Sequence, residues 1–295
     1  MGARKLSARL APWLLAACVL LAATAPALAY GVRDAQGRTV EFARVPQRIV
    51  SLLPSVTESL CALGACARLV GVDAFSNHPP EIAALPRLGK SSAPSVEAIV
   101  RLRPDVVLLA YSPPLMAQLA QFGIPVLALD AHDIAGMRAQ WRTLDALLQQ
   151  QRAEALNARL QDGVERVAQS ARAHAGRSVY FEVDATPYAA GSTSFIGELL
   201  TRLGARNIVA PALGPFPRLS PEYVVRQNPQ IIIHTPETPA SAFVQRPGWR
   251  SIDAVRSGRI CTLSTAEVDL VSRPGPRLDQ AAAVLARCLA LSDKP

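Results

Sequence analysis

One order of apolar and polar segments occurs twice along the chain. In the first half, the apolar run from Ile49 to Leu53 predicts a strand, and a Pro/Ser/Thr loop leads from it into a helix that begins near Thr57. That helix ends at Leu63-Gly64-Ala65, where the glycine allows the left-handed conformation that commonly terminates a helix. A short strand from Leu69 to Val72 follows, so the segment predicts a β-α-β unit.

The second half repeats this unit with matching offsets. A strand at Val179 to Val183 precedes a longer loop and a helix that ends at Leu203-Gly204-Ala205, and Asn207 to Val209 predicts the next short strand. The acids Glu58 and Glu198 each lie five residues before the leucine of the helix end. The shared spacing indicates two related α/β halves.

A second pair of matching segments comes later in each half. Each has a serine at the expected N-cap of a helix, an acid two residues further on, and a proline that ends the helix before an apolar strand. The residues are Ser95, Glu97, Pro104 and Val106 to Ala110 in the first half, and Ser220, Glu222, Pro229 and Ile231 to His234 in the second. Because strands alternate with helices, we expect mostly parallel sheets.

The segment between the halves, Asp133 to Ala175, predicts a helical connection. It has no proline and only two glycines, Gly136 and Gly163, and its apolar residues recur at helical spacing: Met137, Trp141, Leu144, Leu148, Leu156, Leu160, Val164 and Val167. The predicted fold class is therefore α/β, with two Rossmann-like α/β lobes, residues 30–132 and 176–295, built on central, mostly parallel sheets. A single long helix within residues 133–175 would bridge them and limit hinge closure.

The first 29 residues predict an export signal. Arg4, Lys5 and Arg9 precede a nearly continuous apolar run that ends in Ala27-Leu28-Ala29, a small-x-small cleavage pattern, so we expect the chain to be exported and the mature chain to begin at Tyr30. A single-pass membrane anchor is one alternative. Lipidation at Cys18 is another, because Leu15-Ala16-Ala17-Cys18 fits a lipoprotein box.

Composition excludes some partners. Half of the residues are hydrophobic, which is enough for a sizeable core. Cleavage after Ala29 would leave 28 basic and 23 acidic residues, a net charge of +5 in place of +8, with no basic run interleaved with aromatics. The sequence therefore does not predict a nucleic-acid partner.

Four cysteines remain after cleavage, and export would place them where disulfides persist. We expect Cys61 to pair with Cys66, which lies five residues on, and Cys261 to pair with Cys288 near the C-terminus. Four cysteines allow three connectivities, and buried free thiols are the alternative. The absence of a CxxC motif or a Cys/His cluster in the sequence gives no indication of zinc.

Aromatic residues occupy several loops that follow predicted strands. Ligands of parallel α/β sheets bind beyond the carboxyl ends of the strands, so these loops should line a cleft between the lobes. The candidates are Phe75, His78, Tyr111, Tyr188 and Phe216, in a chain with only 5% aromatic residues. Any one of them could be an ordinary packing residue, but as a set they predict a large, flat, partly apolar ligand.

Signatures of catalysis are missing from the sequence. It has no G-x-S-x-G, H-E-x-x-H or G-x-G-x-x-G motif, and the four histidines, His78, His132, His174 and His234, are scattered. We therefore predict a binding protein with no catalytic residues and no metal site of its own. An extracytoplasmic enzyme is the alternative class, and it would require a nucleophile and base that meet in the cleft.

The order of these motifs resembles a known family. The segments RIVSLLPSVTESLCALG, VGVDAFSNHPP, VEAIVRLRPDVVLL, SFIGELLTRLGARNI, LSPEYVVRQNPQIII, RPGWRSIDAVRSGRI and SRPGPRL, over nearly all of residues 47 to 290, resemble the periplasmic binding proteins for iron complexes and cobalamin. Within that family the chain is most similar to the cobalamin receptors. The resemblance implies a solute receptor of an ABC importer, with aromatic side chains of both lobes around the ligand at Phe75 (or His78), Tyr111, Tyr188 and Phe216.

The resemblance also assigns charged residues. Asp269 and Arg273, ahead of Pro274-Gly275-Pro276, match an acid and a base beside the ligand, and capping of the last helix is the alternative for this pair. Glu97 and Glu222 match the paired surface acids that meet arginines of the permease, one acid on each lobe.

Two departures from the cobalamin receptors stand out. The loop Gly89 to Ser95 lacks their tryptophan, and Leu203 replaces the cysteine that pairs with the counterpart of Cys288, which is why we assign Cys261 as its partner.

The expected function is capture of cobalamin as a transported ligand, not as a cofactor, by a monomer that delivers it to an inner-membrane ABC permease dimer with its ATPase. Haem and ferric siderophores are alternatives. Haem would need an axial ligand such as His78, Tyr111 or Tyr188, and an anionic siderophore would need arginines such as Arg273, Arg218 and Arg87.

Overall fold

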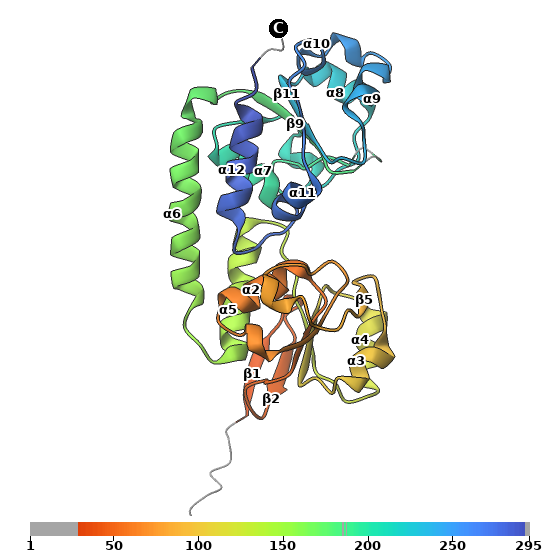
Figure 1. Ribbon diagram of the computed structural model, residues 1–295, viewed down its shortest axis with the longest axis vertical. Coiled ribbons are helices and arrows are strands. Elements are labelled where there is room, and N and C mark those ends of the chain that lie inside the picture. Colours follow the sequence, from red (N-terminus) through yellow and green to blue (C-terminus); the bar gives the residue numbers. More distant parts are fainter. Residues whose placement is uncertain (1–28, 185, 187, 293–295) are drawn as a thin grey trace, which may run out of the picture.

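The computed structural model describes residues 29–184, 186 and 188–292, which form two α/β lobes placed end to end (Figure 1). Cys18 and all but the last residue of the predicted signal peptide lie outside these residues. None of the helices in the described part of the chain combines the length and the apolar character needed to cross a bilayer. The predicted fold class is confirmed, because each lobe is built on a four-stranded parallel sheet.

The two sheets share one strand order, so the sequence repeat corresponds to a repeat in topology. The order is β4-β3-β7-β8 in the N-terminal lobe and β10-β9-β11-β12 in the C-terminal lobe. In each sheet the strand that comes first along the chain, β3 or β9, occupies the second position. The strands are β3 (Ile49–Ser51), β4 (Leu69–Val72), β7 (Val106–Leu109), β8 (Val126–Ala128), β9 (Ser178–Glu182), β10 (Arg206–Asn207), β11 (Ile231–His234) and β12 (Ile260–Thr262). Two antiparallel hairpins, β1 (Tyr30–Arg33) with β2 (Thr39–Phe42) and β5 (Gly89–Lys90) with β6 (Ala93–Pro94), complete the N-terminal lobe.

Helices cover both faces of each sheet. They are α2 (Pro54–Ala62), α3 (Val96–Arg101), α4 (Pro113–Ala120), α5 (Ile134–Leu148), α6 (Ala153–Ala171), α7 (Phe195–Arg202), α8 (Pro221–Gln227), α9 (Ala240–Gln245), α10 (Asp253–Arg256), α11 (Thr265–Val271) and α12 (Leu278–Leu289). Alternate residues of a strand enter different cores: in β7, Val106 and Leu108 join a cluster that runs through both lobes, whereas Val107 and Leu109 join a separate one. Burial on both faces explains why the strands are continuous apolar runs.

The helix ends follow the local signals of the sequence. Gly64 and Gly204 have φ of 85° and 82°, and the next residue of each donates a backbone hydrogen bond to the leucine carbonyl five residues earlier. The hydroxyls of Ser95 and Ser220 each accept a backbone N–H three residues on, at 3.2 Å, as N-caps do. Some boundaries differ from the prediction. Helix α2 begins at Pro54 and not near Thr57, because proline fits the first turn of a helix, and four of the predicted strands are shifted or shortened by one or two residues.

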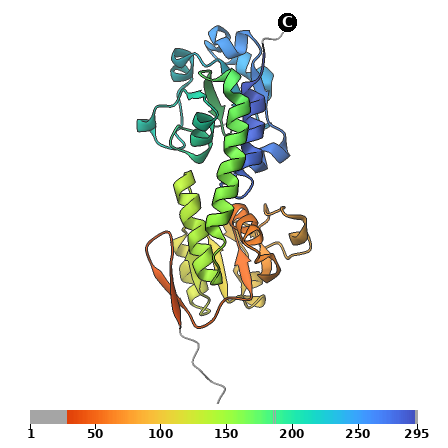
Figure 2. The same cartoon turned by 90° about the vertical axis from the view of Figure 1, so that its left-hand side faces the viewer.

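The connection between the lobes contains two antiparallel helices, and only the second is a bridge. Gln149 adopts a left-handed conformation, φ 51°, that ends α5, and the Asp145 carboxylate accepts the Ala153 N–H at 2.6 Å to start α6. Helix α5 packs into the N-terminal lobe, whereas α6 runs past both lobes (Figures 1 and 2). The apolar spacing alone did not show this break, because apolar positions on both sides of it keep helical spacing.

Helix α6 is held to the C-terminal lobe by α12, which lies along it (Figure 2). A side chain at Gly163 of α6 would place its Cβ only 2.8 Å from the Cβ of Asp279 on α12. The glycine therefore allows the close approach of the two helices, which explains an otherwise unfavourable residue inside a helix.

Candidate functional site

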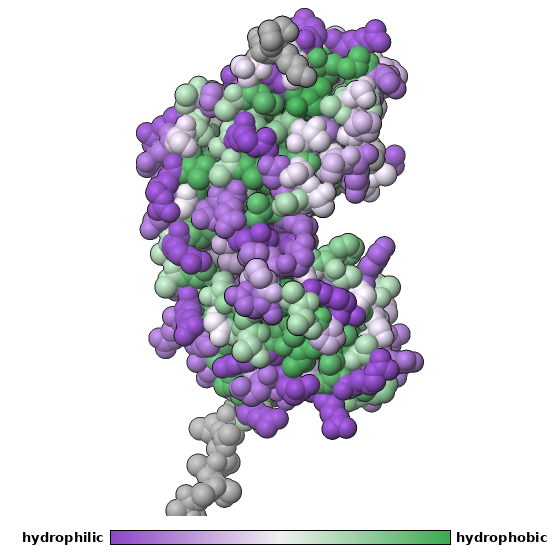
Figure 3. Space-filling view, viewed as in Figure 1, coloured by the Kyte–Doolittle hydropathy of each residue, from purple (hydrophilic) through white to green (hydrophobic). Residues whose placement is uncertain are grey.

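The molecule is hollowed between the two lobes, on the side away from α6 (Figure 3). We call this depression the interlobe hollow. The carboxyl edges of the two sheets face one another there, since loops that follow their strands are in contact: Arg273, beyond β12, donates to the Phe75 carbonyl beyond β4 at 3.0 Å. The Phe195 N–H, beyond β9, likewise donates to the His132 carbonyl beyond β8 at 2.9 Å. Opposed carboxyl edges of parallel sheets are the usual ligand site of such folds.

Three predicted aromatic residues are exposed at these edges. Phe75 is 54% exposed, Tyr111 50% and Tyr188 42%. They follow β4, β7 and β9, so both lobes contribute. Phe216 is half-buried, with its ring 6.4 Å from that of Phe195 in an edge-to-face contact.

The Phe75 loop is held rigidly by buried polar groups. The Asp73 carboxylate, which is fully buried, accepts the Phe75 N–H at 2.9 Å and also the Ser76 hydroxyl. The Ser76 hydroxyl lies 3.0 Å from that of Thr57, and Arg87 donates to the Ser76 carbonyl. A satisfied buried network fixes the loop before any ligand arrives, which lowers the entropy cost of binding.

The structure places His78 apart from the aromatic set. Its side chain lines a separate cavity of about 350 Å³ beside the junction of the lobes, together with Glu58, Arg159, Arg277 and the Cys61–Cys66 disulfide. Burial and then the nearby Arg277 lower the pKa of His78, which favours a neutral ring. Phe75 and His78 were the two residues predicted to contact the ligand from this loop, and Phe75 is the one exposed at the sheet edge.

Arg273, which the resemblance places beside the ligand, is bound by groups of both lobes. Its side chain is 8% exposed and forms hydrogen bonds or ion pairs with Glu58 at 2.9 Å, Asn77 at 2.8 Å and Asp269 at 2.7 Å. Asn77 in turn donates to Asp269 at 2.7 Å. The Asp269–Arg273 pair thus joins the C-terminal lobe to the N-terminal lobe, and its guanidinium is already engaged by protein groups.

Glu58 is the centre of this junction, and the sequence did not single it out for any role. It is 2% exposed on α2, and Arg277 binds both of its oxygens, at 2.8 and 2.6 Å. The only signal was its match to Glu198 in the repeat. Glu198, on α7 of the C-terminal lobe, also joins the lobes, because its carboxylate accepts the Ile134 N–H at the start of α5 at 3.0 Å.

The arginines proposed for an anionic ligand differ in availability. Arg273 and Arg87 are engaged in the contacts described above. Arg218 is exposed and pairs through its backbone with Tyr188. The hairpin β5–β6, where the cobalamin receptors have a tryptophan, offers only small side chains and the exposed Lys90.

Glu97 and Glu222 are exposed in the first turns of α3 and α8, one on each lobe. A hydrogen bond from its own backbone N–H, followed by one from the Ser220 hydroxyl, lowers the pKa of Glu222. That carboxylate therefore stays ionised and available to a cationic partner at neutral pH.

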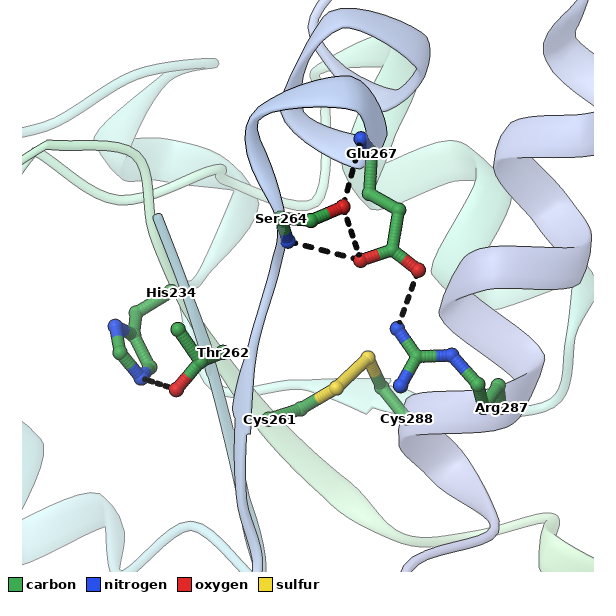
Figure 4. Close-up of a disulfide and its surroundings, with 7 residues drawn as sticks. All are labelled: His234, Cys261, Thr262, Ser264, Glu267, Arg287 and Cys288. Atoms are coloured by element: carbon green, nitrogen blue, oxygen red, sulfur yellow. Dashed lines mark hydrogen bonds and ion pairs between the residues drawn. A yellow bond between two sulfur atoms is a disulfide. The ribbon is translucent and has the colours of Figure 1, made fainter. Parts of the chain in front are cut away.

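Both predicted disulfides are present. Cys61 is bonded to Cys66 at the end of α2, and Cys261 of β12 is bonded to Cys288 of α12 (Figure 4). The second bond is buried, with its cysteines 3% and 0% exposed, and it ties the last helix to the sheet. Leu203, at the position of the missing cysteine, is packed in the core.

The C-terminal lobe carries a buried polar cluster behind the hollow. His234 is 0% exposed at the end of β11, with Nδ1 2.8 Å from the Thr235 carbonyl and Nε2 2.8 Å from the Thr262 hydroxyl (Figure 4). The carbonyl can only accept, so Nδ1 carries the proton and the hydroxyl donates to Nε2. In a neutral ring protonated on Nδ1, both nitrogens therefore form hydrogen bonds.

We expect acid to destabilise the protein through His234. Burial lowers its pKa below the ordinary value of about 6.5, so the unfolded chain takes up this proton first and the folded state loses stability as the pH falls from about 6.5 through the lowered pKa. An NMR titration of the imidazole should give a midpoint below 6.5, with the signal assigned by its loss in His234→Asn. A midpoint at or above 6.5 would contradict the buried neutral ring.

Comparisons with known proteins converge on one family. Residues 49–266 match the family model described as periplasmic binding protein. The chain is 29% identical over 272 residues to the uncharacterized ABC transporter substrate-binding lipoprotein YvrC of Bacillus subtilis, covering 88% of this chain and 84% of that protein. It is 30% identical over 243 residues to the vitamin B12-binding protein of Pectobacterium carotovorum, covering 79% of this chain and 85% of that protein.

Solved structures give the same picture of the fold and a wider range of ligands. A possible iron-binding protein from Staphylococcus epidermidis has a TM-score of 0.73 at 26% identity, with 84% of this chain and 100% of that chain covered. A periplasmic heme binding protein from Pseudomonas aeruginosa has a TM-score of 0.70 at 28% identity, with 85% and 95% covered.

Proposed function

Since the chain belongs to the periplasmic binding protein family, we propose that it captures cobalamin or a closely related corrinoid in the interlobe hollow and delivers it to an inner-membrane ABC permease. The observation that carries the proposal is the set of exposed aromatic residues at the facing sheet edges, Phe75 and Tyr111 from the N-terminal lobe and Tyr188 from the C-terminal lobe. Aromatic faces suit a broad, flat, partly apolar ligand. The identity to vitamin B12-binding proteins supports a corrinoid over other flat ligands.

Haem is the second candidate ligand. The structural similarity to a heme binding protein supports it, and so do two exposed tyrosines, either of which could provide an axial oxygen. An anionic siderophore has weaker support, because two of the three arginines considered for it are engaged in protein contacts.

Titration of the purified protein with cyanocobalamin, haemin and a ferric siderophore tests the proposal. We expect cyanocobalamin to bind more tightly than about 1 μM, which corresponds to roughly 8 kcal/mol, and to be recovered unchanged. Tight haemin binding with no binding of cyanocobalamin would select the second candidate. Conversion of any of the three would favour an enzyme and reject the transport role.

We expect the double replacement of Tyr111 and Tyr188 by alanine to weaken ligand binding by about 5-fold to 150-fold, because each aromatic contact contributes roughly 0.5 to 1.5 kcal/mol. Phe122→Ala is the matched control. Phe122 is 56% exposed, but it lies between α4 and β8, at the amino edge of the sheet, away from the hollow. Calorimetric titration of both variants measures the difference, and equal affinities would remove the tyrosines from the site.

Glu97 and Glu222 are proposed to dock the protein on the permease. Their placement on matching helices of a repeated fold would suit two arginine patches of a two-fold symmetric permease. Glu97→Arg with Glu222→Arg should abolish uptake of labelled cobalamin in cells and leave binding to the purified protein intact. The control is Glu165→Arg on α6, also an exposed acid, and uptake that survives the double charge reversal would contradict the docking role.

We also propose that the protein resides in the periplasm and that the monomer is the transport-competent form. Cleavage at Ala29 and lipidation at Cys18 give different N-termini, which mass spectrometry of the exported protein distinguishes.

A further inference from the structure

A third contact between the lobes, besides α6 and the bonds of Arg273, is made by a segment that holds an exposed histidine beside a carboxylate. The segment comprises residues 129–133, between β8 and α5. At its start the Leu129 N–H donates to the Leu109 carbonyl at the end of β7, at 2.8 Å. At its end the His132 carbonyl accepts the Phe195 N–H of the C-terminal lobe at 2.9 Å. Both ends are therefore fixed, each by a different lobe.

The side chains of this segment alternate between two environments. Ala131 packs against the core, and Asp133 turns back to accept the Gly136 N–H at 2.6 Å as the N-cap of α5. Asp130 and His132 are the alternate residues, and their side chains are 38% and 66% exposed. His132 Nε2 lies 3.3 Å from Asp130 Oδ2. Leu129 is buried and Ala131 packs against the core, whereas Asp130 and His132 are exposed, so this pair faces away from the core.

The surroundings of the pair are those of the interlobe hollow. Leu109 pairs with Ala128 in the sheet, and the bond from Leu129 to Leu109 continues that register, so residue 130 is level with Tyr111 on the neighbouring strand end. On the other lobe, Phe195, which binds the His132 carbonyl, carries the edge-to-face contact with Phe216. His132 thus lies at the junction of the lobes, between the strand end that leads to Tyr111 and the start of α7, and we infer that its exposed side chain faces the hollow.

We propose that His132 supplies an axial ligand to the metal of the complex carried in the hollow, with Asp130 as the residue that positions its ring. An imidazole that is hydrogen-bonded through one nitrogen to a carboxylate is the usual arrangement of a metal-binding histidine, because the carboxylate fixes the tautomer and leaves the other nitrogen as the donor. Asp130 faces Nε2, so Nδ1 is the nitrogen that binds the metal.

The ligand class follows from this chemistry. The lone pair of Nδ1 forms one coordinate bond and a water molecule leaves the metal, with no change of oxidation state. Only a complex with a vacant or water-bound axial position can react in this way, such as haemin or a corrinoid without its own nucleotide base. This inference rests on the proposed function, since it assumes that the hollow receives a flat metal complex.

Visible spectroscopy tests the inference with three probes: haemin, diaquocobinamide and cyanocobalamin, whose two axial positions are both filled. With wild-type protein, haemin and diaquocobinamide should show the spectral change from a water-bound to an imidazole-bound metal. His132→Ala should lose that change and lose at least about 10-fold more affinity for diaquocobinamide and haemin than for cyanocobalamin. Free imidazole added to His132→Ala should restore the imidazole-type spectrum.

Two further variants define the roles. Asp130→Asn keeps the shape but removes the charge, so the imidazole-type spectrum should form with affinity reduced by about 10-fold. His174→Ala, at a histidine on the short turn that follows α6, should behave as wild type. An imidazole-type spectrum that persists in His132→Ala, or one that wild type never forms while it binds the probes, overturns the axial role and leaves the proposed function standing. If wild type binds none of the probes, both proposals fail.

Discussion

Replacing Glu58 by glutamine should lower the free energy of unfolding by about 3 to 5 kcal/mol, the cost expected when one partner of a buried ion pair is removed. Glu58 is 2% exposed and lies between Arg273 and Arg277, whose side chains are 8% and 17% exposed. Two acids and two arginines, with Asp269 as the second acid, make a neutral group across the lobe junction. Glutamine keeps the shape of the side chain and leaves two cations with only Asp269 to balance them.

Urea unfolding at neutral pH measures this loss, with Glu81→Gln as the control. Glu81 lines the cavity that Glu58 and His78 also line, but it is exposed. Its replacement should therefore change the free energy of unfolding by less than about 0.5 kcal/mol. A loss below about 1 kcal/mol in Glu58→Gln would show that the junction is solvated and does not fix the lobes. Because the junction joins the lobes, the variant should also give a broader distribution of interlobe distances between spin labels placed on α3 and α8.

Arg246→Met should destabilise the C-terminal lobe by a similar amount, about 3 to 5 kcal/mol, for a related reason. The guanidinium of Arg246 binds both oxygens of Glu182, at 2.6 and 2.9 Å, and Glu182 is 1% exposed. The same guanidinium lies over the rings of Phe243 and Trp249, with its central carbon 4.5 and 4.6 Å from their centroids. Methionine preserves part of the packing but leaves the Glu182 carboxylate buried with only hydroxyl partners, those of Tyr180 and Thr238.

A double variant separates charge from packing. Adding Glu182→Leu to Arg246→Met removes the unpaired carboxylate, so most of the lost free energy of unfolding should return. Arg142→Met is the surface control, because the Arg142–Glu154 pair is exposed at both ends and should contribute less than about 0.5 kcal/mol. Thermal and urea unfolding followed by circular dichroism provide the comparison. If the double variant is no more stable than Arg246→Met, the cost comes from lost packing and not from the buried charge.

The local signals of the sequence predicted much of the fold. The serine N-caps, the glycine helix ends and most of the apolar strands were found because each depends on groups within a few residues of one another. The break between α5 and α6 was not predicted. It depends on the left-handed Gln149 and on the Asp145 carboxylate that reaches Ala153, and neither interrupts the apolar spacing.

Some features of the candidate site could likewise be predicted from the sequence, and others could not. Exposure of Phe75, Tyr111 and Tyr188 follows from their position after strands, and strand ends can be read from the sequence. The environments of Arg273 and His78 could not be read in this way. Arg273 meets a glutamate 215 positions away, and His78 lies beside Arg277 at the junction of the lobes, so both depend on how the two halves are placed together.

The sequence by itself determined that two related α/β units exist, where their strands end, and which aromatic residues follow those ends, because these properties come from short-range hydrogen bonding and from the period of apolar residues. Only the tertiary structure decided which charged groups the lobes share. Glu58, Asp269, Arg273 and Arg277 meet because α6 and α12 fix the two lobes relative to each other, and such long-range pairs leave no periodic trace in the chain. The same placement brings Asp130 and His132 to the junction of the lobes, since their segment is held by one lobe at each end.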